Sequence, residues 1–236
     1  MTARSHSRDV PSESQANVAS FLSWNCLCIN ILRNPSTFAS VPAPGRICDD
    51  GFLMPSPIGH ALAGLTVGLL ADQSPLRPGT SSGTLRLVGA ATPLALACAA
   101  VAALPDADLL IPGWHRTATH SVTATALVFI LTIVVTGKVT GKPQWRWAAA
   151  LAAAHATHLL LDWLAIDPRP PSGIQLFWPF SHEFFISRLD IFPGTERRIF
   201  RPGALALNAR SAMRELLIML PIAAAALWVR LRRGRG

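Results

Sequence analysis

Hydrophobic residues gather into five stretches in the part of the chain that follows Met54. These stretches, which polar or proline-rich segments separate, are Ile58–Ala71, Leu85–Leu104, Val122–Thr136, Trp145–Ile166 and Leu216–Leu231. A helix that crosses a bilayer needs about 20 mostly apolar residues, so the first stretch is short and could tilt or be partly re-entrant. A backbone in lipid must bond its own polar groups, which favours helix. The pattern predicts an all-α, polytopic membrane helical bundle of four to five spans, with a kink at Pro93 in the second.

The first 53 residues differ from the rest. Residues 1–53 contain scattered Ser, Pro, Asn and Arg without a sustained period. Their one apolar patch, FLSWNCLCINIL, is followed by no good cleavage site for a signal peptide. We interpret the segment as a disordered extension or, with slight preference, as sequence upstream of a true start at Met54. Residues 54–236 are predicted to form the membrane-embedded domain.

Composition supports a membrane location. Of the 236 residues, 50% are hydrophobic and 14% are charged, against roughly 25% charged in an average soluble domain. Several of the seven Trp residues lie beside apolar stretches, as interfacial anchors do. The net charge of +8 comes mainly from Arg and Lys between and after these stretches, which membrane topology explains. The lipid bilayer is therefore the expected partner, and no nucleic acid is expected.

The His and Asp residues fall at particular ends of the predicted helices. If successive helices alternate in direction, all of these residues reach one side of the membrane. The turn between the third and fourth stretches, on the other side, contains Lys138 and Lys142 but no His or carboxylate. The converging residues are His60, Asp106, Asp108, His115, His120, His155, His158 and Asp162. This convergence predicts a site at one membrane face.

The residue types in this group suit a divalent metal. Imidazole nitrogen and carboxylate oxygen together are ligands for Zn²⁺, Mn²⁺ or Fe²⁺. Positions 155, 158 and 162 share one helix face, because successive residues turn by about 100°. Ionisable residues in membrane helices are costly and are functional candidates. Each residue also has a simpler interpretation: His60 could be interfacial, the LPDAD carboxylates could cap a turn, and His155 could be a packing residue.

Five motifs carry a resemblance to a known family. They are GH at 59–60, LPDAD at 104–108, HRTATHS at 115–121, HLLLD at 158–162 and GIQLFWPFS at 173–181. In order and spacing they resemble the bacterial inner-membrane hydrolases that are described as metal-dependent and LexA-binding. The resemblance covers roughly residues 54–181 and implies a multi-pass protein of the bacterial inner membrane with hydrolase activity. It implies a metal site formed by His60, Asp106, Asp108, His115, His120, His158 and Asp162. The PRPP segment after Asp162 departs from the pattern.

Roles within the site follow from the chemistry. We expect His60, His120, His158 and Asp162 to bind the metal, with Zn²⁺ expected and Mn²⁺ or Fe²⁺ as alternatives. Asp106 and Asp108 could complete the ligand set, bridge a second metal, or act as the base on a bound water. The planar guanidinium of Arg116 suits an anionic substrate group. The predicted substrate is a small molecule or a lipid, and an ester or phosphoester of the membrane or envelope fits the location of the site.

A non-catalytic alternative stays open. The same residues could bind a metal ion for structure or transport, although a transporter would need ligands on both faces or a midplane path.

Placing the Arg-rich tail in the cytoplasm, as positive charge near helix ends favours, makes the site open to the periplasm.

Overall fold

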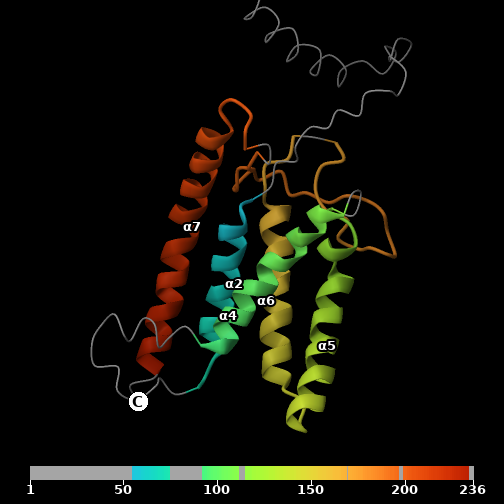
Figure 1. Ribbon diagram of the computed structural model, residues 1–236, viewed down its shortest axis with the longest axis vertical. Helices are drawn as coiled ribbons and strands as arrows, with labels where there is room; N and C mark the ends of the chain where they lie inside the picture. The colour runs from blue at the N-terminus through green and yellow to red at the C-terminus, as the bar shows by residue number, and fades with distance from the viewer. Residues whose placement is uncertain (1–54, 75–91, 112–114, 169, 197–198, 234–236) are drawn as a thin grey trace, which may run out of the picture. The chain divides into compact units, whose positions relative to one another are not determined.

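The computed structural model describes residues 55–74, 92–111, 115–168, 170–196 and 199–233. These residues form five α-helices and two short 3-10 helices, with no β-strand among them (Figure 1). The α-helices are α2 (Pro57–Ala71), α4 (Pro93–Ala103), α5 (Val122–Thr140), α6 (Trp145–Trp163) and α7 (Ala204–Arg233), and the 3-10 helices are η2 (Leu104–Leu110) and η3 (Ala118–His120). The all-α class predicted from the sequence is confirmed. The prediction for residues 1–53 lies outside the described residues.

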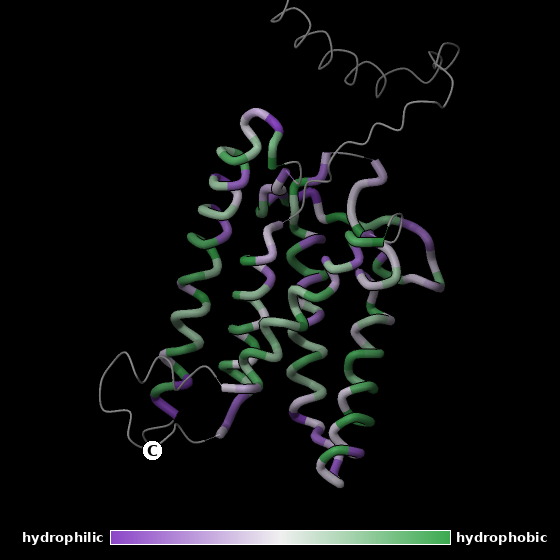
Figure 2. Tube along the Cα trace, viewed as in Figure 1, coloured by the Kyte–Doolittle hydropathy of each residue, from purple (hydrophilic) through white to green (hydrophobic). Residues whose placement is uncertain are grey.

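Three described segments are long and apolar enough to cross a membrane: Pro93–Leu110, Val122–Thr140 and Ala204–Arg233. Figure 2 shows hydrophobic residues along much of α5 and the middle of α7, where lipid would take the place of a protein core. No residue of α5 is buried, as expected for a helix that faces lipid on most sides. α2 is shorter, and α6 combines a weakly apolar, Ala-rich sequence with His and Asp residues that turn inward.

Pro93 begins a helix instead of kinking one. Thr92 before it is extended (φ −78°, ψ 162°), and the Thr92 side chain accepts a hydrogen bond from the Ala95 backbone N–H at 3.2 Å. Proline fits this first helical position because its missing N–H would have no partner there. The predicted kink is therefore wrong. The remainder of that apolar stretch, residues 85–91, lies outside the described residues.

α7 begins at Ala204, well before the predicted Leu216. Its first turns carry Asn, Arg, Ser and Glu, which hydropathy assigns to a loop, yet the polar residues Ser211 and Glu215 are buried. Ser211 donates from Oγ to the Gly194 carbonyl at 2.8 Å. Long-range hydrogen bonds therefore stabilise a helical segment that an apolar pattern does not reveal.

α2 lies at the centre of the bundle, where it packs against α4, α6 and α7. Gly64 and Gly68 let α2 approach α4 closely. A methyl group at position 64 would lie 2.6 Å from the Ala102 Cβ, and one at position 68 would lie 3.1 Å from the Cys98 Cβ. Small residues at a helix contact are typical of membrane proteins, because they increase van der Waals contact between backbones.

Arginine side chains donate hydrogen bonds to the backbone carbonyls at the carboxyl end of α2. Arg233 donates to the Leu70 carbonyl at 3.0 Å, Arg146 to the Ala71 carbonyl at 3.5 Å, and the buried Arg230 to the Asp72 carbonyl at 2.8 Å. Cations are favourable at a helix carboxyl end. The amino end of α2 therefore lies at the other end of the bundle, away from this basic group.

The segment between α6 and α7 folds over that other end (Figure 1). Isolated bridges join Ala165 to Phe192 and Ile174 to Phe185. Gln175 donates its backbone N–H to the Arg116 carbonyl at 2.9 Å. The GIQLFWPFS and HRTATHS motifs thus lie together.

Candidate metal centre

Four elements bring the candidate ligands to one end of the bundle. His60 lies in the first turn of α2, which Ser56 caps by accepting the Gly59 N–H. Asp106 lies in η2, which continues from α4. His120 ends η3. His158 and Asp162 lie one turn apart on α6. Helices that alternate in direction thus place these residues together, as the spacing predicts.

The Nε2 atoms of three histidines surround the carboxylate of Asp162. The distances to its oxygens are 3.5 Å from His60, 3.4 Å from His120 and 3.1 Å from His158. The same three Nε2 atoms lie 3.8–3.9 Å from the Asp106 carboxylate. The three imidazoles are fully buried, and the Asp162 and Asp106 side chains are 4% and 10% exposed. Two carboxylates and three imidazoles therefore face one small volume.

These ligand atoms lack other partners. Within the described residues, no hydrogen bond reaches the Nε2 atoms of His60, His120 and His158, the two oxygens of Asp162, or Oδ1 of Asp106. Leaving so many buried polar atoms unsatisfied is costly. Two ligand atoms bound to one tetrahedral metal, with bonds of about 2.0–2.1 Å, lie about 3.3 Å apart. The distances of 3.1–3.5 Å from the histidine Nε2 atoms to Asp162 are close to this value. The residues therefore fit a divalent cation.

Two imidazoles are oriented by groups on their far side. His158 donates from Nδ1 to the Ala102 carbonyl at 2.8 Å. His120 has Nδ1 3.2 Å from Oδ2 of Asp108. A proton on Nδ1 leaves the Nε2 lone pair available to a metal, which is the usual arrangement for metal-binding histidines. The backbone of α4 and the LPDAD motif therefore fix both rings.

Asp108 and His115 lie behind His120. Asp108 accepts from Nδ1 of His115 at 2.7 Å and from the Thr119 hydroxyl. Burial is the largest influence on the pKa of His115 and lowers it, against the opposing hydrogen bond to Asp108. Burial also lowers the pKa of His120, but the nearby carboxylates of Asp106, Asp108 and Asp162 outweigh it and raise that pKa to about 9.

Two neighbouring groups of residues could each hold a metal ion. One contains His60, His158 and Asp162, and the other contains Asp106, His115 and His120. Asp106 lies near histidines of both groups, so it is placed to bridge two cations if both are bound. The structure thus brings all seven predicted metal residues into one neighbourhood, with Asp108 in contact with imidazole Nδ1 atoms.

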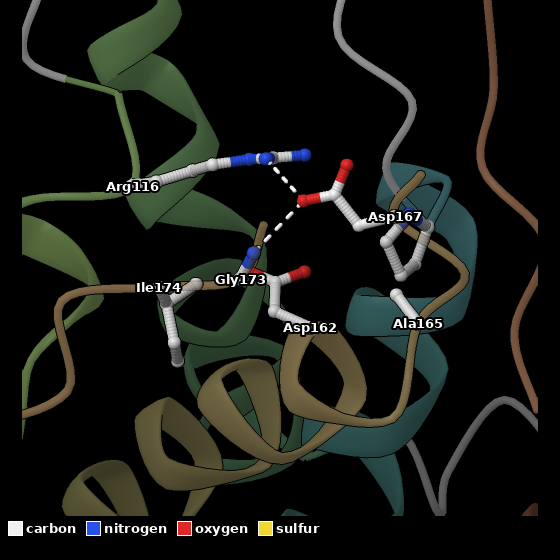
Figure 3. Close-up of a pocket in the computed structure, with 7 residues that line it drawn as sticks. Arg116, Asp162, Ala165, Asp167, Gly173 and Ile174 are labelled. Atoms are coloured by element: carbon white, nitrogen blue, oxygen red, sulfur yellow. Dashed lines mark hydrogen bonds and ion pairs between the residues drawn. The ribbon is translucent and has the colours of Figure 1, made fainter. Parts of the chain in front are cut away.

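A small pocket lies beside the site (Figure 3). Arg116, Asp162 and Asp167 are among its lining residues. Arg116 donates from Nη1 to Oδ2 of Asp167 at 2.5 Å. Figure 3 shows the carboxylate of Asp162 below this pair. The sequence-predicted residue Arg116 therefore lines the same pocket as Asp162, a candidate metal ligand.

Sequence reasoning missed two acidic residues near the site. Glu215 of α7 is fully buried and accepts from the Ser56 backbone N–H at 2.7 Å and from the Ser56 hydroxyl. A methyl group at position 59 would lie 2.6 Å from Oε2 of Glu215, so the glycine before His60 makes room for this carboxylate. Glu215 could have been found as an acid beside an apolar stretch. Asp167 lies in a proline-rich loop and gave no such signal.

Comparisons with known proteins place the chain in a family. The family described as YdjM inner membrane protein matches residues 54–235, a range that contains all of the candidate ligands. Comparison with curated proteins gave no match, and neither did comparison with solved structures. The match agrees with the apolar spans and with the inner-membrane location predicted from the sequence. The chain belongs to the YdjM family of inner membrane proteins.

Proposed function

We propose that this protein is a membrane-bound, metal-dependent hydrolase. The observation that carries the proposal is the set of buried, unpartnered ligand atoms on His60, His120, His158 and Asp162. One of these residues, Asp162, also lines a pocket with Arg116. Metal sites that only stabilise a fold are closed, whereas catalytic sites keep a position accessible to water or substrate. The pocket that Asp162 helps to line is the proposed route for water or substrate.

Zn²⁺ is the proposed metal, with Mn²⁺ or Fe²⁺ as alternatives. Three imidazoles and one or two carboxylates suit all three ions. A bound Zn²⁺ would supply Lewis acidity and lower the pKa of a coordinated water to about 7. Asp106 has the more exposed of the two carboxylates that face the histidines. It is therefore proposed to accept the proton from water, while Asp108 holds His120 in place.

The surroundings favour a substrate from the membrane or envelope. Leu110, Phe180 and Phe200 are 86%, 90% and 95% exposed, and they lie on η2 and on the segments between α6 and α7 that cover the site's end of the bundle. Apolar side chains at the end of a membrane bundle can enter the lipid interface. An ester or phosphoester lipid could then reach the pocket from the bilayer. With the basic end of α2 in the cytoplasm, the pocket opens to the periplasm.

A non-catalytic metal site is the second candidate. The complete burial of the three imidazoles is also what a structural cation tying α2, η3 and α6 together would require. The two candidates differ in whether bound metal produces turnover.

The test is hydrolysis by the full chain purified in detergent and loaded with Zn²⁺, Mn²⁺ or Fe²⁺. Phosphomonoesters, phosphodiesters and carboxylic esters would be supplied in soluble form and as lipids in mixed micelles. We expect one class to be hydrolysed by the loaded protein, and neither by chelated protein nor by Asp162→Asn. His182→Gln, which changes an exposed histidine, should stay active. Stoichiometric metal without turnover of any ester would favour the structural candidate.

A further inference from the structure

The ion pair between Arg116 and Asp167 lines the pocket, and the carboxylate of Asp162 lies below it in Figure 3. The Arg116 and Asp167 side chains are only 6% and 3% exposed. Burying two charges is expensive, and apolar residues of similar volume often stabilise a protein as well or better. Stability alone is therefore a weak reason for a buried pair at the mouth of a candidate active site.

The donors around Asp167 form an oxyanion-binding group. Oδ2 of Asp167 accepts from Nη1 of Arg116 at 2.5 Å and from the Gly173 backbone N–H at 2.9 Å. A planar guanidinium and a backbone N–H directed at the same point are the donors that proteins use to bind carboxylate and phosphate oxygens. Asp167 occupies a position that an oxygen of a bound anion would otherwise take.

The backbone holds both donors in uncommon conformations. Arg116 has a φ of +65°, in a region that costs free energy for a residue other than glycine. Gly173 has a φ of +98°, and a side chain there would collide with the Phe185 carbonyl. Gln175 donates to the Arg116 carbonyl, which keeps the two segments together. Contacts other than Asp167 thus hold the backbones of Arg116 and Gly173 in place.

We propose that Asp167 is an internal occupant of an oxyanion subsite, and that the phosphate group of a phosphate-ester substrate replaces it on Arg116 and Gly173. The proposal rests on the proposed function, since it places that phosphate beside the metal ligand Asp162. A phosphate offers several non-bridging oxygens, so one can contact the two donors while another faces the His and Asp ligands. When no substrate is bound, Asp167 is a counter-charge for the buried guanidinium of Arg116.

Exchange between Asp167 and substrate predicts opposite effects of removing the two partners. Asp167→Asn preserves shape but removes the competing charge, so binding of phosphate should tighten severalfold. Arg116→Gln removes the charged donor and should weaken binding by about tenfold or more. Arg116→Lys keeps the charge without the planar donors, so its affinity for phosphate should lie between those of wild type and Arg116→Gln. Arg188→Gln is the matched control, because it removes an exposed arginine from the same loop region.

The experiment is calorimetric titration of the detergent-purified full chain with inorganic phosphate, before and after chelation of metal. Acetate is titrated in parallel as a carboxylate. We expect the opposite shifts of Asp167→Asn and Arg116→Gln in both metal states. Unchanged phosphate affinity in both variants, with lower thermal stability, would overturn the proposal in favour of a purely structural pair. Stronger binding of acetate than of phosphate would overturn the substrate class.

Two further measurements are needed. One distinguishes a soluble phosphate ester from a phospholipid as the ligand, and the other distinguishes failure of the subsite from failure of the proposed function. Glycerol phosphate and phosphatidic acid in mixed micelles are compared, and loss of binding in Arg116→Gln supports the subsite for whichever binds more tightly. Arg116-dependent phosphate binding without any ester hydrolysis would contradict the proposed function and leave the subsite intact. Hydrolysis of a phosphate ester with equal phosphate affinity in Arg116→Gln and wild type would contradict the subsite alone.

Discussion

The substitution Asp108→Asn tests whether Asp108 binds the metal itself or only orients the imidazole ring of His120. Asp108 is buried and accepts from Nδ1 of His115 at 2.7 Å and from the Thr119 hydroxyl, with Nδ1 of His120 at 3.2 Å. Replacing the carboxylate by an amide leaves the shape but weakens the hold on the His120 ring. Loss of such a partner lowers metal affinity about 10–100-fold, which is about 1.4–2.7 kcal/mol.

The assay is competition for Zn²⁺ between the detergent-purified protein and a chelator of known affinity. We expect Asp108→Asn to bind the same number of ions as wild type with an affinity lower by that factor. Asp190→Asn, which removes an exposed carboxylate, serves as the control and should match wild type. Unchanged affinity would refute the orienting role, and loss of an ion from the stoichiometry would show that Asp108 is itself a ligand.

Packing, helix capping and ionisation can be tested separately. Gly64→Leu should destabilise the bundle by about 3 kcal/mol or more by forcing α2 from α4, whereas Gly137→Ala, where a methyl group meets nothing closer than 3.9 Å, should leave the melting temperature in detergent unchanged. Glu215→Ala should cost about 1.5–3 kcal/mol, because Ser56 loses a charged hydrogen-bond acceptor; an unchanged melting temperature would rule this out. The pKa of His120 is raised to about 9 from its ordinary value of about 6.5. Its protonation therefore stabilises chelated protein fully below about pH 6.5, and that contribution is lost as the pH rises through about 9. The melting temperature should fall over this range in chelated wild type and less in His120→Gln; parallel curves would contradict this.

The location of the site could be predicted because charge is expensive in a membrane. His158 and Asp162 interrupt an apolar helix, and His60 lies one turn into another. A short connection starts each helix on the side of the membrane where the previous helix ended. Helices that alternate in direction therefore bring these residues to one side of the membrane. The five residues that face one another in the structure were all among those predicted.

Finer detail depends on contacts between residues distant in sequence. Whether Asp108 faces a metal or an imidazole depends on the turn of η2, because adjacent positions of a 3-10 helix point in different directions. Asp167 meets Arg116 only after the loop that follows α6 has folded back. Glu215 meets Ser56 across 159 positions of sequence.

Helix boundaries failed for a related reason. Hydropathy identifies residues that prefer lipid, so it extended the second stretch through Pro93 and omitted the polar first turns of α7. The cap formed by Thr92 sets the start of α4, and the hydrogen bond from Ser211 to Gly194 stabilises the polar first turns of α7. Neither is expressed in an apolar pattern.

His60, His120, His158 and Asp162 are proposed to bind a divalent cation. The decisive measurement is the metal content of the detergent-purified full chain, determined by inductively coupled plasma mass spectrometry. We expect at least one tightly bound ion per chain in wild type and in His182→Gln. We expect loss of that ion in His158→Ala and Asp162→Asn, with the protein still folded. A wild-type protein that binds no divalent ion even after incubation with Zn²⁺, Mn²⁺ and Fe²⁺, or variants that retain the full content, would contradict this proposal.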